Sequence, residues 1–151
     1  MTRLTPNMED CSGFTLFELI AVLSLITILS VTAIYNLRSM SHPLNNAGFS
    51  VEHFLRYARS RAITSTEVVK VNVVSSGRLQ AYSSDSCAGT LTPLADLSLD
   101  LPSGAMFTDS TASVCFTQRG FALTSASFPL TDTEGFDKTV KVAIGGGTKI
   151  D

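Results

Sequence analysis

The sequence predicts an α+β protein, in which a long N-terminal helix leads into a small antiparallel β-sheet head and packs on it. Three observations predict this class. Residues 14–34 form an almost unbroken apolar run, residues 51–62 repeat apolar side chains at helical spacing, and beyond residue 66 the hydrophobic period changes from about 3.6 to about 2. The chain has 151 residues, so one small domain remains once the apolar run is set aside.

The first element is an apolar helix. No charged residue interrupts the sequence from Leu19 to Tyr35. At the helical rise of ~1.5 Å per residue, residues 14–34 extend about 31 Å, which matches the ~30 Å hydrocarbon core of a bilayer. We therefore predict a membrane-spanning helix over residues 14–36. Glu18 falls within it, and an ionised carboxylate is costly there unless a partner relieves it, so Glu18 is a candidate functional residue.

The second element is an amphipathic continuation of the helix over residues 37–66. The tripeptide Ser41-His42-Pro43 disfavours helical geometry before the proline and predicts a kink or break near Pro43. Glu52 and Arg56 have the i, i+4 spacing of a solvated ion pair. The apolar stripe that should carry the head consists of Val51, Phe54, Leu55, Ala58 and Ala62.

The remaining residues, 67–151, predict a β-rich head. Alternating valines over residues 69–73, a turn at residues 75–77 and a return over residues 78–82 predict a β-hairpin. Further strands are expected at residues 105–107, 113–118, 121–124 and 139–144. The run Gly145-Gly146-Gly147 lacks the spacing of a phosphate-binding loop, so we interpret this run and the residues after it as a flexible C-terminal tail.

Composition and motifs argue against an enzyme, a cofactor site and a globally basic nucleic-acid binder. The formal net charge is -2, and the sequence contains no recognisable catalytic motif. His42 and His53 have no second metal ligand at a suitable spacing, so we interpret both as surface residues. Asp132, Glu134 and Asp137 could supply oxygen ligands to calcium, but a solvated acidic turn is the favoured interpretation. No metal site is therefore predicted.

The start of the apolar run carries a more specific signal. The segment Gly13-Phe14-Thr15-Leu16-Phe17-Glu18-Leu19-Ile20 resembles the class III signal of type IV pilins and type II secretion pseudopilins. The resemblance implies that residues 1–13 are a leader, that a prepilin peptidase cuts between Gly13 and Phe14 on the cytoplasmic side, and that the new amine of Phe14 is methylated. Glu18 would then accept this cationic amine, from its own chain or from a neighbouring subunit. An ordinary signal anchor is the alternative.

Two further segments resemble one subgroup of these proteins. Residues 57–64 resemble its "AR-x-x-A" helix end, and residues 116–121 resemble a strand-turn signature of its head. The subgroup is GspH/FimT, which comprises the H-type pseudopilins and the FimT-like minor pilins. Its fold, the pilin fold, has the α+β arrangement predicted above. The resemblance implies a structural subunit of a type II secretion or type IV pilus filament.

The resemblance also implies a location and partners. The chain would cross the bacterial inner membrane once, with its N-terminus in the cytoplasm and its head in the periplasm, and would enter a periplasmic filament. Its partners would be sister pilins or pseudopilins, the prepilin peptidase, the membrane and the inner-membrane assembly platform. Lys and Arg residues near the span do not set the orientation, which therefore rests on the resemblance. The type of machine stays open.

Cysteine usage fits export to an oxidising compartment. Cys87 and Cys115 remain once the leader is removed. They form a candidate disulfide that closes a loop of about 29 residues and contributes about 3 to 4 kcal/mol on the chain-entropy model. Two unconnected thiols are the alternative.

A second function class is a DNA-binding minor pilin of the FimT-like kind, acting in natural transformation. Such a role needs an exposed basic patch. Possible nucleic-acid contacts are Arg56, Arg59, Arg61 and Lys149. The tail, however, contains Gly147-Thr148-Lys149 where the DNA-binding relatives show a Gly-Arg-x-Arg pattern. The structural role is therefore favoured, and nucleic acid is not an expected partner.

Overall fold

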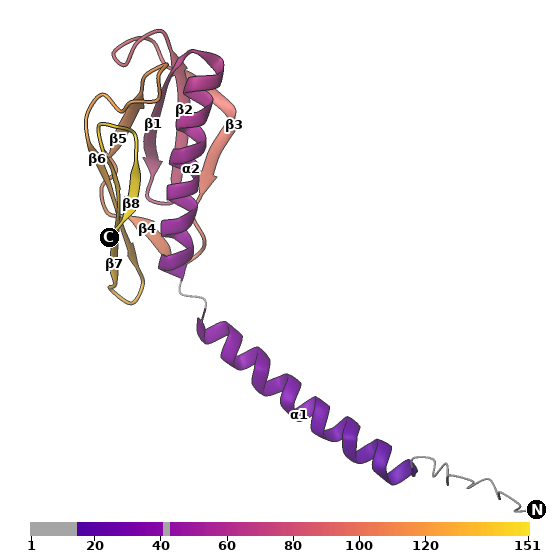
Figure 1. Cartoon of the computed structure of the whole chain (residues 1–151). Coiled ribbons are helices and arrows are strands. Elements are labelled where there is room, and N and C mark those ends of the chain that lie inside the picture. The colour runs from indigo at the N-terminus through magenta and orange to yellow at the C-terminus, as the bar shows by residue number, and fades with distance from the viewer. Residues whose placement is uncertain (1–14, 41–42) are drawn as a thin grey trace, which may run out of the picture. The chain divides into compact units, whose positions relative to one another are not determined.

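The computed structural model describes residues 15–40 and 43–151. They form two compact units that divide after Met40. In Figure 1, α1 is the helix of the first unit and α2 is the helix of the second. The leader, residues 1–13, and the predicted cleavage site between Gly13 and Phe14 lie outside the described residues, and so does His42.

The first unit contains α1, Leu16–Met40, a helix of 25 residues that confirms the helical prediction for the apolar run. The side chains of residues 16–30 are exposed. Among residues 15–40 and 43–151, the structure contains no helix with both the length and the apolar character that crossing a bilayer requires. The membrane span predicted over residues 14–36 stays a prediction.

The second unit begins with α2, Pro43–Ser65. α1 ends at Met40 and α2 begins at Pro43. Residues 41–42, where the kink or break is expected, lie outside the described residues, so the interruption stays a prediction. Proline suits the first position of a helix, because its fixed φ is helical and its nitrogen needs no intrahelical partner there. The predicted stripe is confirmed as part of the buried face of α2, formed by Val51, Phe54, Leu55, Ala58 and Ala62.

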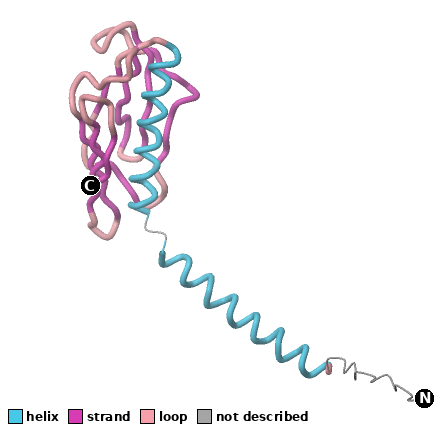
Figure 2. The backbone as a smooth tube through the Cα atoms, viewed as in Figure 1, coloured by secondary structure: helices cyan, strands magenta, loops and turns pink. Residues whose placement is uncertain are grey.

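Two four-stranded sheets complete the second unit, and their paired strands are antiparallel. The first sheet has the order β3-β2-β1-β5, with β1 (Val68–Ser75), β2 (Arg78–Ser84), β3 (Thr92–Asp100) and β5 (Ser113–Phe116). The second has the order β4-β6-β7-β8, with β4 (Ala105–Phe107), β6 (Ala126–Asp132), β7 (Asp137–Val142) and β8 (Thr148–Ile150). Figure 2 shows α2 lying along these strands, and α2 contacts both sheets.

One hydrophobic core joins α2 to the two sheets. Leu55 comes from the helix, Val71 and Phe116 come from the first sheet, and Phe128 and Val140 come from the second; all five side chains are 0% exposed. Burying each of them contributes about 1.5–3 kcal/mol relative to leaving it in water. The prediction of an α+β fold with a helix packed on antiparallel sheet is confirmed.

The strand predictions are confirmed in part. The predicted hairpin corresponds to β1 and β2, in which Val71 pairs with Ala81. The expected strands at residues 105–107, 113–118 and 139–144 correspond to β4, β5 and β7. The strand expected at residues 121–124 is wrong, because this segment forms only an isolated bridge between Phe116 and Ala122. β3 and β6 have no counterpart among the predicted strands.

The prediction of a flexible C-terminal tail is wrong. Residues 148–150 form β8, and just beyond it Asp151 and Thr139 exchange two backbone hydrogen bonds of 2.9 and 3.1 Å. Gly146 permits the turn between β7 and β8 because it has a positive φ of 76°, which residues with a side chain rarely adopt. Its N–H donates to the carbonyl oxygen of Ala143 at 2.7 Å. The glycine run therefore closes a turn, and the chain continues as a paired strand.

Candidate functional site

The start of α1 places Glu18 in contact with Thr15. The backbone N–H of Glu18 donates to the Thr15 hydroxyl oxygen at 3.3 Å, and the backbone N–H of Thr15 donates to Glu18 Oε2 at 3.4 Å. This reciprocal pair is a capping box, which satisfies two N–H groups that have no partner within the helix. The Thr-x-x-Glu spacing is a sequence signal for this box, although Glu18 was expected only to pair with the amine of Phe14.

Apart from Glu18 and three hydroxyl side chains, the surface of α1 is apolar over residues 16–30. Its large exposed side chains include Leu16 and Phe17, which are 78% and 82% exposed. The hydroxyls of Ser24, Thr27 and Ser30 donate to carbonyl oxygens of their own helix at 2.7 to 2.8 Å, so they require no outside partner. A helix that is apolar all round is normally covered by lipid or by other protein. The first unit therefore presents a surface suited to an apolar environment.

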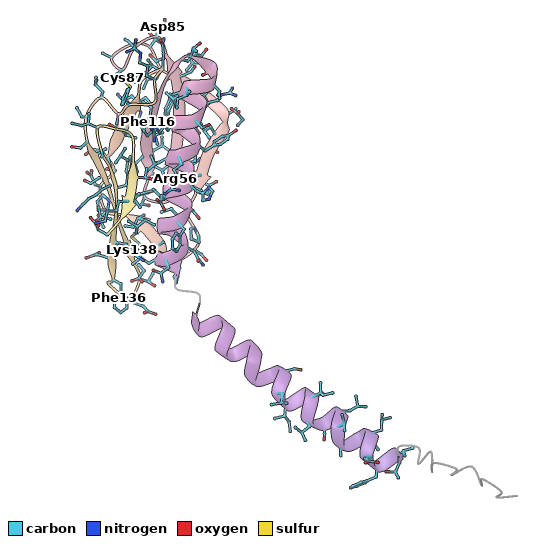
Figure 3. The ribbon with its side chains drawn as sticks, in the orientation of Figure 1. Arg56, Asp85, Cys87, Phe116, Phe136 and Lys138 are labelled. Carbon is cyan, nitrogen blue, oxygen red and sulfur yellow. A yellow bond between two sulfur atoms is a disulfide. The ribbon has the colours of Figure 1, made fainter. Side chains whose placement is uncertain are left out.

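A disulfide fixes one end of the head. It joins Cys87, in the loop after β2, to Cys115 in β5, with a Cα–Cα distance of 5.8 Å. Cys115 is 7% exposed, and Figure 3 shows Cys87 at the end of the head that also carries Asp85. The cysteines that the sequence singled out as a candidate pair are thus joined in the structure, and the bridge ties a surface loop to an edge strand of the first sheet.

Arg59 joins the two segments on which the subgroup resemblance rests. Its Nε donates to the carbonyl oxygen of Gly120 at 2.9 Å, across 61 positions of sequence. Gly120 has a positive φ of 76°, and its N–H donates to the carbonyl oxygen of Thr117 at 2.8 Å. A Cβ atom at Gly120 would collide with the side chain of Ile63. The last turns of α2 are therefore held against the turn that follows β5 by a hydrogen bond and by close packing.

A family comparison matches the region that contains this junction. The model of the family described as "Type II transport protein GspH" matches residues 50–147. The chain belongs to the GspH family. The matched region contains most of α2 together with β1 to β7. The resemblance to type IV pilin-like proteins of the GspH/FimT type is therefore confirmed.

Solved structures share the fold of this GspH-family chain. The type IV minor pilin FimU of Pseudomonas aeruginosa is 17% identical with a TM-score of 0.55, and the match covers 72% of this chain and 87% of FimU. The minor pseudopilin EpsH from the type 2 secretion system of Vibrio cholerae is 13% identical with a TM-score of 0.57, covering 72% of this chain and 95% of EpsH. Comparison with curated proteins found no match. The likeness to FimU and EpsH establishes the pilin fold.

Two of the arginines considered for nucleic-acid contact have partners within the GspH-family head. Arg56 Nη2 lies 2.6 Å from Glu52 Oε1, which confirms the predicted ion pair, and Arg56 Nε donates to the hydroxyl oxygen of Thr148 at 3.1 Å. Arg56 therefore connects α2 to β8. Arg59 donates to Gly120, as described above.

The other two cations do not complete a basic patch with Arg56. Lys149 forms an ion pair with Asp151. Successive side chains of a strand point to opposite faces, so Lys149 lies on the face of β8 opposite to Thr148, which contacts Arg56. Arg61 is exposed. The part of the chain that the structure describes thus offers no arrangement that favours DNA binding.

The acidic turn between β6 and β7 is held by one of its own carboxylates. Asp132 is 8% exposed, so the interpretation as a wholly solvated turn is wrong for this residue. Its Oδ1 accepts the backbone N–H groups of Glu134 and Phe136, both at 2.9 Å. Within the described residues, no group of His, Cys, Asp and Glu side chains is arranged to hold a metal ion. Asp132 therefore serves the turn, and this role explains its burial.

Proposed function

We propose that this chain is a structural subunit, a minor pilin or pseudopilin, of a type II secretion or type IV pilus filament. The observation that carries the proposal is the combination of α1, whose exposed surface over residues 16–30 is mainly apolar, with a head of the GspH family. Such a helix needs lipid or other helices to cover it. The membrane covers it before assembly, and the helices of neighbouring subunits cover it in the filament. FimU is a minor pilin and EpsH is a minor pseudopilin, which supports the same role.

The proposal includes the maturation and location that the N-terminal signal implies. A prepilin peptidase removes residues 1–13 by cutting between Gly13 and Phe14, and the amine of Phe14 is methylated. The subunit is held in the inner membrane by its apolar helix, with its head in the periplasm, and it meets sister pilins and the assembly platform there. The disulfide between Cys87 and Cys115 supports a head that folds in an oxidising compartment. The subunit acts by assembly and performs no catalysis of its own.

Maturation is tested by intact-mass analysis of the protein extracted from membranes of cells with an active prepilin peptidase. We expect a chain that begins at Phe14 and carries one methyl group. The control is the same protein from cells that lack the peptidase, which should retain residues 1–13. Full-length protein in both samples would contradict the proposal.

Assembly is tested separately, by asking whether the mature subunit co-purifies with sheared filaments or crosslinks to sister pilins in membranes. We expect co-purification that depends on the peptidase, because an uncut leader leaves polar residues on the helix that must pack between its neighbours. A mature chain that is found only as a free membrane protein would contradict the filament role while leaving the processing intact.

A further inference from the structure

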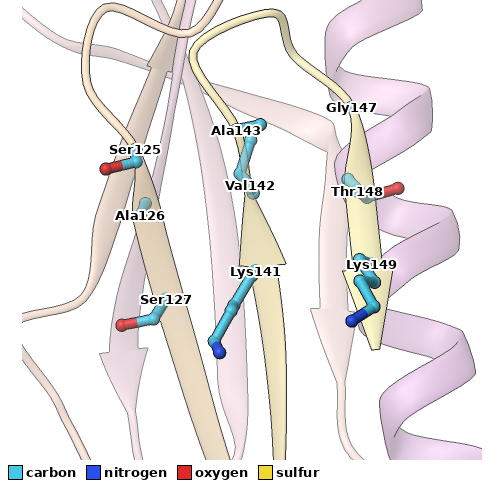
Figure 4. Close-up of a pocket in the computed structure, with 9 residues that line it drawn as sticks. All are labelled: Ser125, Ala126, Ser127, Lys141, Val142, Ala143, Gly147, Thr148 and Lys149. Atoms are coloured by element: carbon cyan, nitrogen blue, oxygen red, sulfur yellow. The ribbon is translucent and has the colours of Figure 1, made fainter. Parts of the chain in front are cut away.

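A row of polar side chains crosses the outer face of the second sheet. Ser127 of β6 pairs with Lys141 of β7, and Lys141 pairs with Lys149 of β8, so the three residues lie side by side on three strands. All three are exposed. They line a shallow cleft of about 540 Å³, whose lining also includes Ser125 and the small side chain of Ala143. Figure 4 shows Lys141 and Lys149 on the face of the sheet that Ser127 shares.

The two lysines that line the cleft already pair with a carboxylate of the chain itself. Lys141 Nζ lies 2.7 Å from Asp151 Oδ2, and Lys149 pairs with the other oxygen of the same carboxylate. These two contacts lower the pKa of Asp151 to about 2, with the hydrogen bond from Lys141 as the largest cause. Two ammonium groups thus share one carboxylate, which leaves one positive charge in excess among the three groups. The side chains of Lys141 and Lys149 remain 58% and 77% exposed.

We propose that this cleft is a docking site for acidic side chains on the head of a sister pilin or pseudopilin, a proposal that rests on the function proposed above. The excess positive charge fits a negatively charged partner, and the hydroxyls of Ser125 and Ser127 can donate to further carboxylate oxygens. The contact with Asp151 of the same chain shows that the two ammonium groups can bind one carboxylate together.

A protein partner fits this cleft better than a free small anion does. An exposed lysine gains little from a carboxylate in open water, because both groups remain hydrated and salt screens them. A broad protein surface that covers the cleft removes that water and also buries Ala143 and the stems of the two lysines. The charges then set the register of the two heads, because a mismatched charge would be left unpaired.

The inference is tested with a photo-crosslinking amino acid at Ser127 of the full-length chain, expressed in cells together with its sister subunits. The test variant is Lys141→Glu/Lys149→Glu, and the companion is the neutral variant Lys141→Gln/Lys149→Gln. The matched control is Arg78→Glu, because Arg78 is an exposed cation of the first sheet that also pairs with a carboxylate, that of Asp100 at 3.6 Å. Thermal unfolding of each variant identifies any that fail to fold.

We expect a crosslinked peptide that contains Asp or Glu and derives from a pilin-like protein. Its yield should fall by roughly tenfold in the double Glu variant, fall less in the double Gln variant and stay unchanged in Arg78→Glu, as expected for charge recognition. Asp151→Asn should raise the yield, because it frees both ammonium groups. An unchanged yield in the folded double Gln variant, or a product with no acidic residue, would overturn the inference.

The two proposals fail in distinguishable ways. If the subunit matures and co-purifies with filaments but Ser127 crosslinks to no sister subunit, the docking cleft is refuted and the filament role stands. If the subunit neither matures nor enters a filament, the proposed function itself is refuted, and the partner assigned to the cleft falls with it.

Discussion

Glu18 has one role in the structure and a second role in the proposed filament, and substitution can tell the two apart. In the structure its backbone N–H and its carboxylate form the capping box with Thr15, at 3.3 and 3.4 Å. In the proposed filament the same carboxylate accepts the charged amine of Phe14. Glutamine at position 18 retains a capping oxygen but removes the charge, whereas Thr15→Ala removes the hydroxyl of the box and retains the charge. Glu18→Val removes both functions of the carboxylate.

The two roles differ in magnitude. Both capping bonds are long for hydrogen bonds and lie on an exposed turn, so the loss of the box costs about 1 kcal/mol at most, which is roughly a fivefold effect. Breaking one side of a buried ion pair costs about 3–5 kcal/mol, because the abandoned charge stays desolvated. That cost corresponds to a more than roughly hundredfold loss of incorporation at equilibrium.

The assay is crosslinking of each full-length variant to sister pilins in membranes, with leader cleavage followed in the same sample. If the ion pair governs assembly, Glu18→Gln and Glu18→Val should both lose nearly all crosslinking, and Thr15→Ala should lose little, with cleavage unaffected in all three. Wild-type crosslinking of Glu18→Gln, together with equal losses in Glu18→Val and Thr15→Ala, would refute the ion pair and leave capping as the role of Glu18. Equal crosslinking in every variant would show that Glu18 is not a docking group.

Three further predictions concern the head. Thiol labelling of the oxidised, denatured protein should detect neither Cys87 nor Cys115, and reduction should destabilise the head by about 3 to 4 kcal/mol in denaturant unfolding; stoichiometric labelling before reduction would contradict the bridge. Gly120→Ala should cost about 1–3 kcal/mol because of its positive φ and the crowding at its Cβ position, whereas Gly77→Ala, which has open space around it, should be nearly neutral. The carboxyl of Asp151 should titrate by NMR with a pKa of about 2, below its ordinary 3.8. Because the pKa is lowered in the folded state, the contribution of this carboxylate to the stability of the head is complete above pH 3.8 and is lost as the pH falls toward 2. A midpoint near 3.8 would show that the lysine contacts do not persist in solution.

The elements that the sequence predicted well are those whose signal is local. The buried stripe of α2 repeats at helical spacing within one segment, and β1 and β2 alternate valines on either side of a short turn. The capping box of Thr15 and Glu18 was not predicted, although its Thr-x-x-Glu signal is equally local. In each case the residues that define the element lie within a few positions of one another, so a single sequence contains the necessary information.

β6 was missed because its local signal argues against a central strand. Pro129 lies in its middle, and proline cannot donate to a strand neighbour. The structure tolerates it because the carbonyl oxygen of Pro129 faces the end of β4, where it accepts the N–H of Thr108 at 3.1 Å. β4 ends at Phe107, so the strand pairing of β4 and β6 does not need an N–H from Pro129. Only the position of β4 reveals this.

The contact between Arg59 and Gly120 shows how two local signals become one structural feature. Each residue lies in a segment that resembles the GspH/FimT subgroup, but nothing in either segment predicts that they touch, because 61 positions separate them. The contact forms only if α2 is long enough to reach the turn after β5, and if β5 lies at the edge of the first sheet. Arg59 donates to the backbone carbonyl of Gly120. Position 120 has room only for glycine, because a Cβ atom there would collide with the side chain of Ile63. The end of the helix and the turn of the head therefore constrain each other. We expect Arg59→Ala to loosen the same turn as Gly120→Ala, and the two substitutions to be less than additive in denaturant unfolding, because both disturb the one junction between the end of α2 and this turn.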